Sequence, residues 1–128
     1  MAIDGHPKVL IVDDNDMMRT LLRGILRAEE CDVIGEARNG IAAIEAIKTM
    51  KPDIVFLDVL MPEMNGLDAL KAIRDTYPDI TVIMITGSPS KENVEASIEN
   101  GAAGFIIKPF NSAKVIATLN RACGIAKK

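Results

Sequence analysis

The chain has 128 residues, which is typical of one domain, with 48% apolar and 26% charged residues and a net charge of −3. It carries no cluster of Lys or Arg that could neutralise several phosphates, so direct nucleic-acid binding is not expected. No apolar run approaches the ~20 residues of a membrane span, and no signal-peptide pattern opens the chain. The spacing of Cys31 and Cys123 is not that of a metal site, and predicts reduced thiols in a cytoplasmic protein.

Five short apolar runs predict five β-strands. In chain order they are residues 9–12, the weaker run 33–34, and residues 54–57, 80–85 and 105–107. Within each run the apolar residues are continuous rather than alternating with polar ones. This pattern is typical of parallel strands that are buried on both faces of a sheet.

Amphipathic helices are predicted between and after these runs, because apolar residues recur there at a spacing of three or four. The repeats are Met18, Leu22 and Ile25; Ile41, Ile44 and Ile47; Leu67, Leu70, Ile73 and Tyr77; Val94 and Ile98 in a shorter helix; and Val115 and Leu119. Five strand–helix units predict an α/β fold, a single doubly wound parallel sheet with helices on both faces.

Several polar residues stand where these helices are expected to begin or end. Asn65 is a candidate N-cap with Asp68 at the third helical position, and Pro78 should end that helix. The last helix should begin at Asn111 or Ser112. For the first helix, residues 14, 15 and 16 (Asp-Asn-Asp) are all possible caps.

Distinctive polar residues follow four of the five predicted strands. Asp13 and Asp14 come after the first, Asp58 after the third, Thr86 after the fourth and Lys108 after the fifth. Alone, an aspartate here is often a helix cap and a lysine is often a solvated surface charge. In an open parallel sheet, however, the carboxyl ends of the strands share one edge, and ligands bind there. The joint arrangement therefore predicts a site.

The residue types of this site favour phosphoryl chemistry. Clustered carboxylates repel one another unless a cation lies among them, and Mg²⁺ is usually held by a few carboxylates together with waters and a phosphate oxygen. Asp58 could then attack a phosphoryl group as a carboxylate nucleophile. Lys108 could balance the added charge, while the Thr86 hydroxyl donates a hydrogen bond to a phosphoryl oxygen.

These residues resemble the receiver domains of two-component response regulators. Residues 58–66 read DVLMPEMNG and match the family pattern D-x-x-M-P-x-M-x-G at every fixed position. Asp13 and Asp14, Thr86, and the segment 108–110 (Lys-Pro-Phe) occupy the other characteristic positions. The similarity extends from residue 8 to about residue 123 and is greatest to single-domain receivers of the CheY type. It implies a flavodoxin/CheY-like sheet of strand order 2-1-3-4-5 with five helices.

The resemblance also implies a role for individual residues. Asp58 would be phosphorylated, Asp14 and Asp58 would bind Mg²⁺ directly, and Asp13 would act largely through water. The main-chain carbonyl of Leu60 would complete the metal ligands, and Thr86 would be the switch hydroxyl. The remaining implied features are Lys108 as the phosphate-pairing lysine, a cis Lys108–Pro109 bond, and Phe105 at the aromatic switch position.

Function follows from the same resemblance. We expect residues 1–128 to be a single receiver domain with no output domain, not a free-standing enzyme, which accepts its phosphoryl group from a histidine kinase. Its output would be a protein contact through the surface between about residues 91 and 123, with chemotaxis or motility control as one setting. We expect a monomer or weak dimer. Phe105 lacks the tyrosine hydroxyl of many relatives, and the residues at positions 60 and 88 (Leu, Ser) bear on phosphoryl lifetime and phosphatase access.

Three alternatives are open at this point. Residues 14–16 form a D-x-D sequence like that of haloacid-dehalogenase phosphatases, but that class needs a late acidic pair where residues 86–89 read TGSP. A flavodoxin-type flavin carrier needs a hydroxyl-rich phosphate loop, whereas residues 13–16 read DDND and would repel phosphate. A receiver-like binding module that signals without phosphorylation would not need the acid, Thr and Lys set.

Overall fold

One parallel sheet organises the molecule, for which the computed structural model describes residues 6–61, 64–87 and 89–123. Its five strands lie in the order β2-β1-β3-β4-β5, so the predicted doubly wound α/β topology is confirmed. The strands are β1 (Lys8–Val12), β2 (Asp32–Ala37), β3 (Ile54–Asp58), β4 (Thr81–Thr86) and β5 (Gly104–Ile107). All five residues of β3 are buried, as expected for a central strand covered on both faces.

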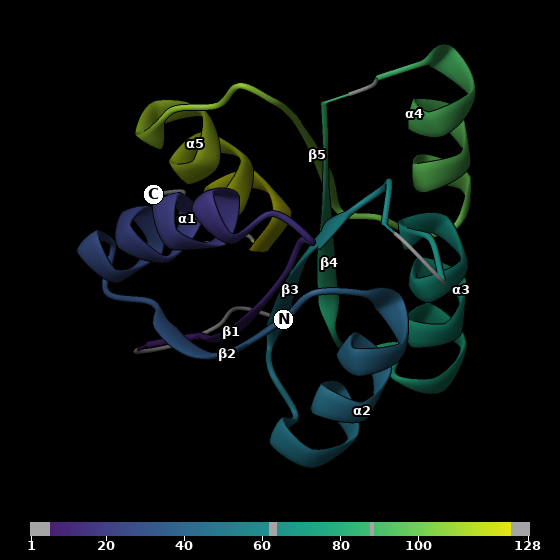
Figure 1. Cartoon of the computed structure of the whole chain (residues 1–128), viewed down its shortest axis with the longest axis horizontal. Helices are drawn as coiled ribbons and strands as arrows, with labels where there is room; N and C mark the ends of the chain where they lie inside the picture. Colours follow the sequence, from purple (N-terminus) through teal and green to yellow (C-terminus); the bar gives the residue numbers. More distant parts are fainter. Residues whose placement is uncertain (1–5, 62–63, 88, 124–128) are drawn as a thin grey trace.

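Helices cover both faces of the sheet. They are α1 (Asp16–Ala28), α2 (Gly40–Met50), α3 (Gly66–Thr76), α4 (Lys91–Glu99) and α5 (Ser112–Cys123). Helices α1 and α5 pack on one face, and α2, α3 and α4 lie on the other (Figure 1). Two apolar clusters result, one on each side of the sheet. No helix among the described residues is both long and apolar enough to cross a membrane.

The helix starts explain why the first two aspartates are available for a site. Asn15 caps α1, since its side-chain oxygen accepts a hydrogen bond from the N–H of Met18 at 3.0 Å. Of the three candidate caps, Asn15 is therefore the one used. Asp14 lies before the cap and outside the helix. Asn65 caps α3 as predicted, with its oxygen 2.9 Å from the N–H of Asp68.

Three expectations about individual elements need correction. Strand β2 extends well beyond the apolar pair 33–34, because an edge strand needs fewer buried side chains than a central one. Ile41 is 51% exposed rather than on the buried face of α2, which passes through Ala43 and Ile47. Residues 41 and 47 lie about 120° apart around a helix, at about 100° per residue, so an i+3 repeat cannot keep both inside.

Helix α4 also turns its predicted apolar residue outward. Ile98 is 64% exposed, whereas the small residue Ser97 is fully buried. The Ser97 hydroxyl donates to the main-chain oxygen of Asn93 at 2.8 Å, which satisfies it inside the protein. The helix predicted from Val94 and Ile98 is therefore present, but Ile98 contributes to the surface rather than to the core.

Candidate functional site

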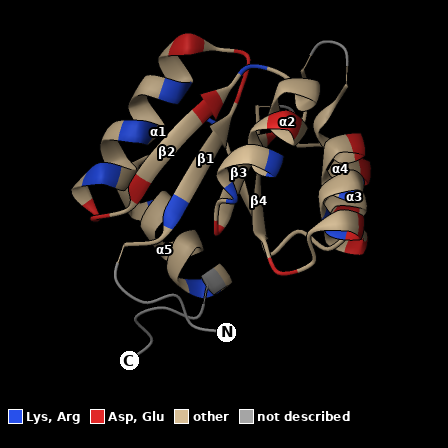
Figure 2. Ribbon diagram, turned by 90° about the horizontal axis from the view of Figure 1, so that it is seen from below, with Lys and Arg blue, Asp and Glu red and all other residues tan. Residues whose placement is uncertain are grey.

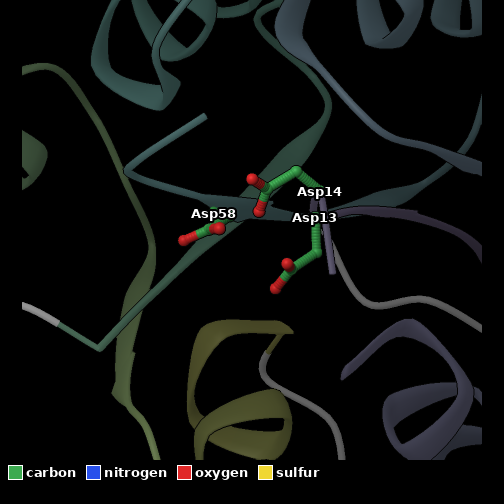
Figure 3. A group of neighbouring side chains, drawn as sticks. All are labelled: Asp13, Asp14 and Asp58. Atoms are coloured by element: carbon green, nitrogen blue, oxygen red, sulfur yellow. The ribbon is translucent and has the colours of Figure 1, made fainter. Parts of the chain in front are cut away.

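Three carboxylates meet at the carboxyl edge of the sheet. Asp13 and Asp14 follow β1, and Asp58 ends the neighbouring strand β3 (Figure 3). Each contributes one oxygen to a group whose members all lie within 4.8 Å of one another. Asp13 and Asp58 are only 3% and 4% exposed, while Asp14 is exposed to solvent. The acid cluster predicted from the sequence is therefore formed by the fold.

Lys108, which follows β5, places its ammonium inside this cluster. Its Nζ lies 2.9 Å from Oδ2 of Asp13 and 3.6 Å from Oδ2 of Asp58. The other oxygen of Asp13 accepts the N–H of Asn15 at 2.9 Å. Both oxygens of Asp13 thus have protein partners. One ammonium facing three carboxylates leaves an excess of negative charge, which favours an added cation.

The crowding is reflected in the acidity of Asp58. The pKa of its carboxyl is raised from 3.8 to about 6, first by burial and then by the negative charges of Asp13 and Asp14. The ammonium of Lys108 and a hydrogen bond from the main-chain N–H of Leu60 oppose the increase. The ionised form of Asp58 is therefore destabilised when no cation is bound, since its carboxylate is buried and repelled by the two neighbouring carboxylates.

This repulsion predicts a stability effect. Because the pKa of Asp58 is higher in the folded chain, the folded state holds a proton that the unfolded state loses between pH 3.8 and about 6. Stability in chelator should therefore fall as the pH rises through this window. Asp58→Asn removes the charge, so at neutral pH it should increase the free energy of unfolding by on the order of 2 kcal/mol. The melting temperature should rise accordingly.

Thermal unfolding in chelator at several pH values measures this effect. The matched control is Asp75→Asn, which changes an exposed carboxylate on α3. We expect this control to leave the pH profile of the wild type unchanged. A lower melting temperature for Asp58→Asn at neutral pH would contradict the repulsion.

Thr86 and Phe105 lie on the two strands beyond Asp58. Thr86 ends β4 and is fully buried, and its main-chain oxygen accepts the N–H of Lys108 at 2.8 Å. Phe105 in β5 is partly exposed and packs against the apolar cluster on the α2 and α3 side. The Lys108–Pro109 bond is cis, as the resemblance implied. These positions agree with the sequence expectation, although their functional roles stay predictions.

The loop after Asp58 needs glycine at Gly66. The N–H of Gly66 donates to the main-chain oxygen of Val59 at 2.7 Å. A Cβ at this position would lie 2.0 Å from the main-chain oxygen of Asp58, so no other residue fits without movement of the backbone. The motif's glycine is therefore explained by close approach of α3 to the site.

Access to the cluster is set by the surrounding residues. Leu60 is 54% exposed, and a Cβ added at Gly87 would only reach ordinary contact with the Lys108 side chain, at 3.8 Å. Of the three carboxylates, Asp14 is the exposed one, so solvent reaches the cluster through its side chain. Residues 62, 63 and 88, to which the motif and the expectation about phosphatase access refer, lie outside the described residues.

Sequence reasoning missed one residue that contacts the site. Arg19 in α1 donates from Nη1 to the main-chain oxygen of Asp13 at 2.6 Å. A main-chain acceptor leaves no mark in the sequence, so only the charge pair of Arg19 with Asp16 at i+3 could have drawn attention to this arginine.

Comparison with known proteins agrees with this geometry. The chain matches the response regulator receiver domain family over residues 9–120. It is 42% identical to the chemotaxis protein CheY of Listeria monocytogenes over 90% of this chain and 97% of that protein. It is 43% identical to CheY of Thermotoga maritima over 89% and 95% of the two chains. The structure of a CheX-CheY-BeF3-Mg²⁺ complex from Borrelia burgdorferi matches with a TM-score of 0.85 and 34% identity, over 88% of this chain and 86% of that chain.

A doubly wound sheet with clustered carboxylates and a lysine at its carboxyl edge defines the class of two-component receivers. The chain belongs to the response regulator receiver domain family, and both relatives named above are CheY proteins. Receivers of this type are not enzymes in the ordinary sense, and the family typically binds Mg²⁺ at an acidic pocket. Membership of the receiver family favours a receiver over the phosphatase and flavin-carrier alternatives.

Proposed function

We propose that the chain is a phosphorylation switch. In the presence of Mg²⁺, its Asp58 accepts a phosphoryl group from a histidine kinase, and a protein-binding surface then changes. The observation that carries this proposal is the placement of a buried Asp58 carboxylate 3.6 Å from the Lys108 ammonium. The oxygens of two further carboxylates lie within 4.8 Å of it. These are the nucleophile, the cation and the acid pair that aspartyl-phosphate chemistry needs.

The acid cluster suits Mg²⁺. Carboxylate oxygens are hard ligands, and Mg²⁺ binds through few protein groups while it keeps several waters. The carboxylates of Asp14 and Asp58 and the main-chain carbonyl of Leu60 would hold the ion directly. Asp13 would act through water, which agrees with the engagement of both its oxygens by Asn15 and Lys108. Bound Mg²⁺ would neutralise charge on the phosphoryl oxygens.

The chain's own residues can carry the transfer. A carboxylate oxygen of Asp58 forms the new bond to phosphorus while the bond from phosphorus to the donor breaks, and the donor keeps that electron pair. Lys108 already lies beside Asp58 and pairs with the added negative charge. Thr86 lies at the end of the neighbouring strand, and its hydroxyl donates a hydrogen bond to a phosphoryl oxygen. The chain acts on its own carboxylate, including when water later hydrolyses the acyl phosphate.

The proposed output is a change in the surface formed by α4, β5 and α5, between about residues 91 and 123. Movement of the Thr86 hydroxyl toward the phosphoryl group would free space for the Phe105 ring. Ile98 on α4 and Ile107 on β5 are 64% and 44% exposed, so this surface already offers apolar area to a protein partner. Such a contact would be the output of a single receiver unit.

Chemotaxis or motility control is the proposed setting. It rests on the names of the CheY relatives, which match this chain over most of their length. A downstream partner is suggested by the CheX-CheY complex, whose CheY chain has the same fold. The kinase and the target are proposed only as classes of protein, and the cytoplasmic location stays a prediction.

Exposure to a small phosphodonor tests the proposed chemistry. We expect acetyl phosphate with Mg²⁺ to add one phosphoryl group to each chain, seen by intact mass, and chelator to suppress the addition. We also expect no sustained turnover of phosphomonoesters, which separates a switch from a phosphatase. Absence of the modification under these conditions would overturn the proposal, and sustained turnover would favour the phosphatase alternative.

Metal binding should itself stabilise the fold. Mg²⁺ relieves the repulsion among the three carboxylates and binds the folded state, so the melting temperature should rise with the Mg²⁺ concentration. Asp14→Ala should suppress most of this rise, while Asp75→Asn should leave it intact. Thermal unfolding across a Mg²⁺ titration measures the difference. A melting temperature that is indifferent to Mg²⁺ would contradict the metal assignment.

A further inference from the structure

The guanidinium of Arg19 contacts the acid loop, which is the segment after β1 that carries Asp13 and Asp14, and two neighbouring elements. Arg19 lies in the first turns of α1, and its side chain is only 14% exposed. Its Nη1 donates to the main-chain oxygen of Asp13 at 2.6 Å, and its Nε donates to Oε1 of Glu36 at 3.0 Å. Its Nη2 pairs with the carboxylate of Asp16. The loop after β1, the end of β2 and the start of α1 are therefore joined through one side chain.

The contact with Asp13 acts on the backbone that carries both acids. The carbonyl oxygen of Asp13 belongs to the planar peptide that joins Asp13 to Asp14, so a bond to this oxygen restrains the orientation of that plane. The N–H of Asp13 donates to the main-chain oxygen of Ala37 at 3.1 Å, which restrains the preceding plane. The direction in which the Asp14 side chain leaves the loop depends on both restraints.

We propose that Arg19 is a positioning residue for the acid site, which holds the Asp13–Asp14 peptide so that Asp14 and Asp58 share one cation. This inference rests on the proposed function and assigns a role to a residue outside the motif. The planar fork of arginine can serve several acceptors in fixed directions, whereas the lysine ammonium cannot reproduce that geometry. Outer groups that orient metal ligands in this way typically change metal affinity by about 10–100-fold when they are removed.

Arg23 provides a matched control within the same helix. It lies one turn after Arg19 and pairs with the other carboxylate oxygen of Glu36. Among the described contacts, Arg23 bonds to Glu36 and not to the acid loop. The basic residues of α1 lie beside β2, whose end is acidic (Figure 2). Loss of Arg23 therefore removes a similar ion pair and the same charge, but it leaves the hydrogen bond from Arg19 to the main-chain oxygen of Asp13 in place.

Calorimetric titration of the metal-free chain with Mg²⁺ tests the role. We expect Arg19→Gln and Arg19→Lys to weaken Mg²⁺ binding about 10-fold, and Arg23→Gln to bind like the wild type. Glu36→Gln keeps the contact between Arg19 and Asp13 while loosening one support of the guanidinium, so it should weaken binding less. Circular dichroism of each variant confirms that the comparison is between folded chains.

The phosphorylation rate provides a second readout. For the Arg19 variants, the Mg²⁺ concentration that gives half the maximal rate should increase about 10-fold, while the rate at saturating Mg²⁺ stays close to that of the wild type. Unchanged Mg²⁺ affinity in the Arg19 variants, or an equal loss in Arg23→Gln, would overturn the positioning role alone. Absence of Mg²⁺ binding by the wild type would overturn the proposed function and this role together.

Discussion

Asp58→Asn is expected to abolish phosphorylation by acetyl phosphate, because the amide nitrogen and oxygen of asparagine are not nucleophiles of the kind that a carboxylate provides. The same substitution is expected to stabilise the chain in chelator, since it removes one of three crowded carboxylates. Loss of chemistry combined with a gain of stability cannot arise from unfolding. Intact mass and thermal unfolding on the same samples measure both effects.

Two comparisons make this prediction specific. Asp75→Asn, an exposed carboxylate on α3, should be phosphorylated like the wild type. Asp14→Asn should slow phosphorylation by weakening Mg²⁺ binding, and added Mg²⁺ should restore part of the rate. A stoichiometric phosphoryl group on Asp58→Asn would contradict the assignment. A phosphoryl group that is retained on Asp58→Asn but lost on Asp14→Asn would favour the phosphatase alternative.

Thr86→Ala is expected to separate phosphorylation from its output. Asp58 should still accept the phosphoryl group, but most of the phosphorylation-dependent change on α4, β5 and α5 should disappear. Thr86 is buried at the end of β4, and its main-chain oxygen is bonded to the N–H of Lys108, so it lies between the site and β5. Amide chemical shifts with and without phosphodonor measure the change, and Thr86→Ser, which retains the hydroxyl, is the matched control.

The size of the switch limits what Thr86 can do alone. Moving a population from mostly inactive to mostly active needs about 5.5 kcal/mol of differential stabilisation. One neutral hydrogen bond contributes about 1 kcal/mol, so Lys108 must share the task. We therefore expect Thr86→Ala to reduce the response strongly without removing every shift near Lys108. A response in Thr86→Ala equal to that of the wild type would contradict coupling through Thr86 and Phe105.

Much of the fold could be predicted because its determinants are local. The continuous apolar runs mark buried parallel strands, and Asn65 and Asn111 mark helix starts that the structure confirms through bonds of 2.9 Å. The acid cluster followed from topology, since residues after parallel strands share one edge of the sheet. The choice of Asn15 as the cap of α1 could not be predicted, because its acidic neighbours are equally suited to the role.

The remaining differences arise from three-dimensional contacts. Ile41 and Ile98 are apolar and regularly spaced, yet both are exposed, since spacing alone does not say which part of a helix surface the sheet covers. The bond from Arg19 to the carbonyl of Asp13 could not be predicted, because any residue at position 13 would offer the same acceptor. Contacts to the main chain are the part of a site that residue types do not reveal.

Locating the phosphoryl group within the wild-type chain tests the central claim most directly. Borohydride reduces an aspartyl phosphate to the corresponding alcohol, which survives digestion and can be assigned by peptide mass spectrometry. After treatment with acetyl phosphate and Mg²⁺, we expect reduction at Asp58 and at no other aspartate. Reduction at Asp14 instead, or a phosphorylated chain in which Asp58 is unmodified, would contradict the assignment of Asp58 as the phosphorylated residue.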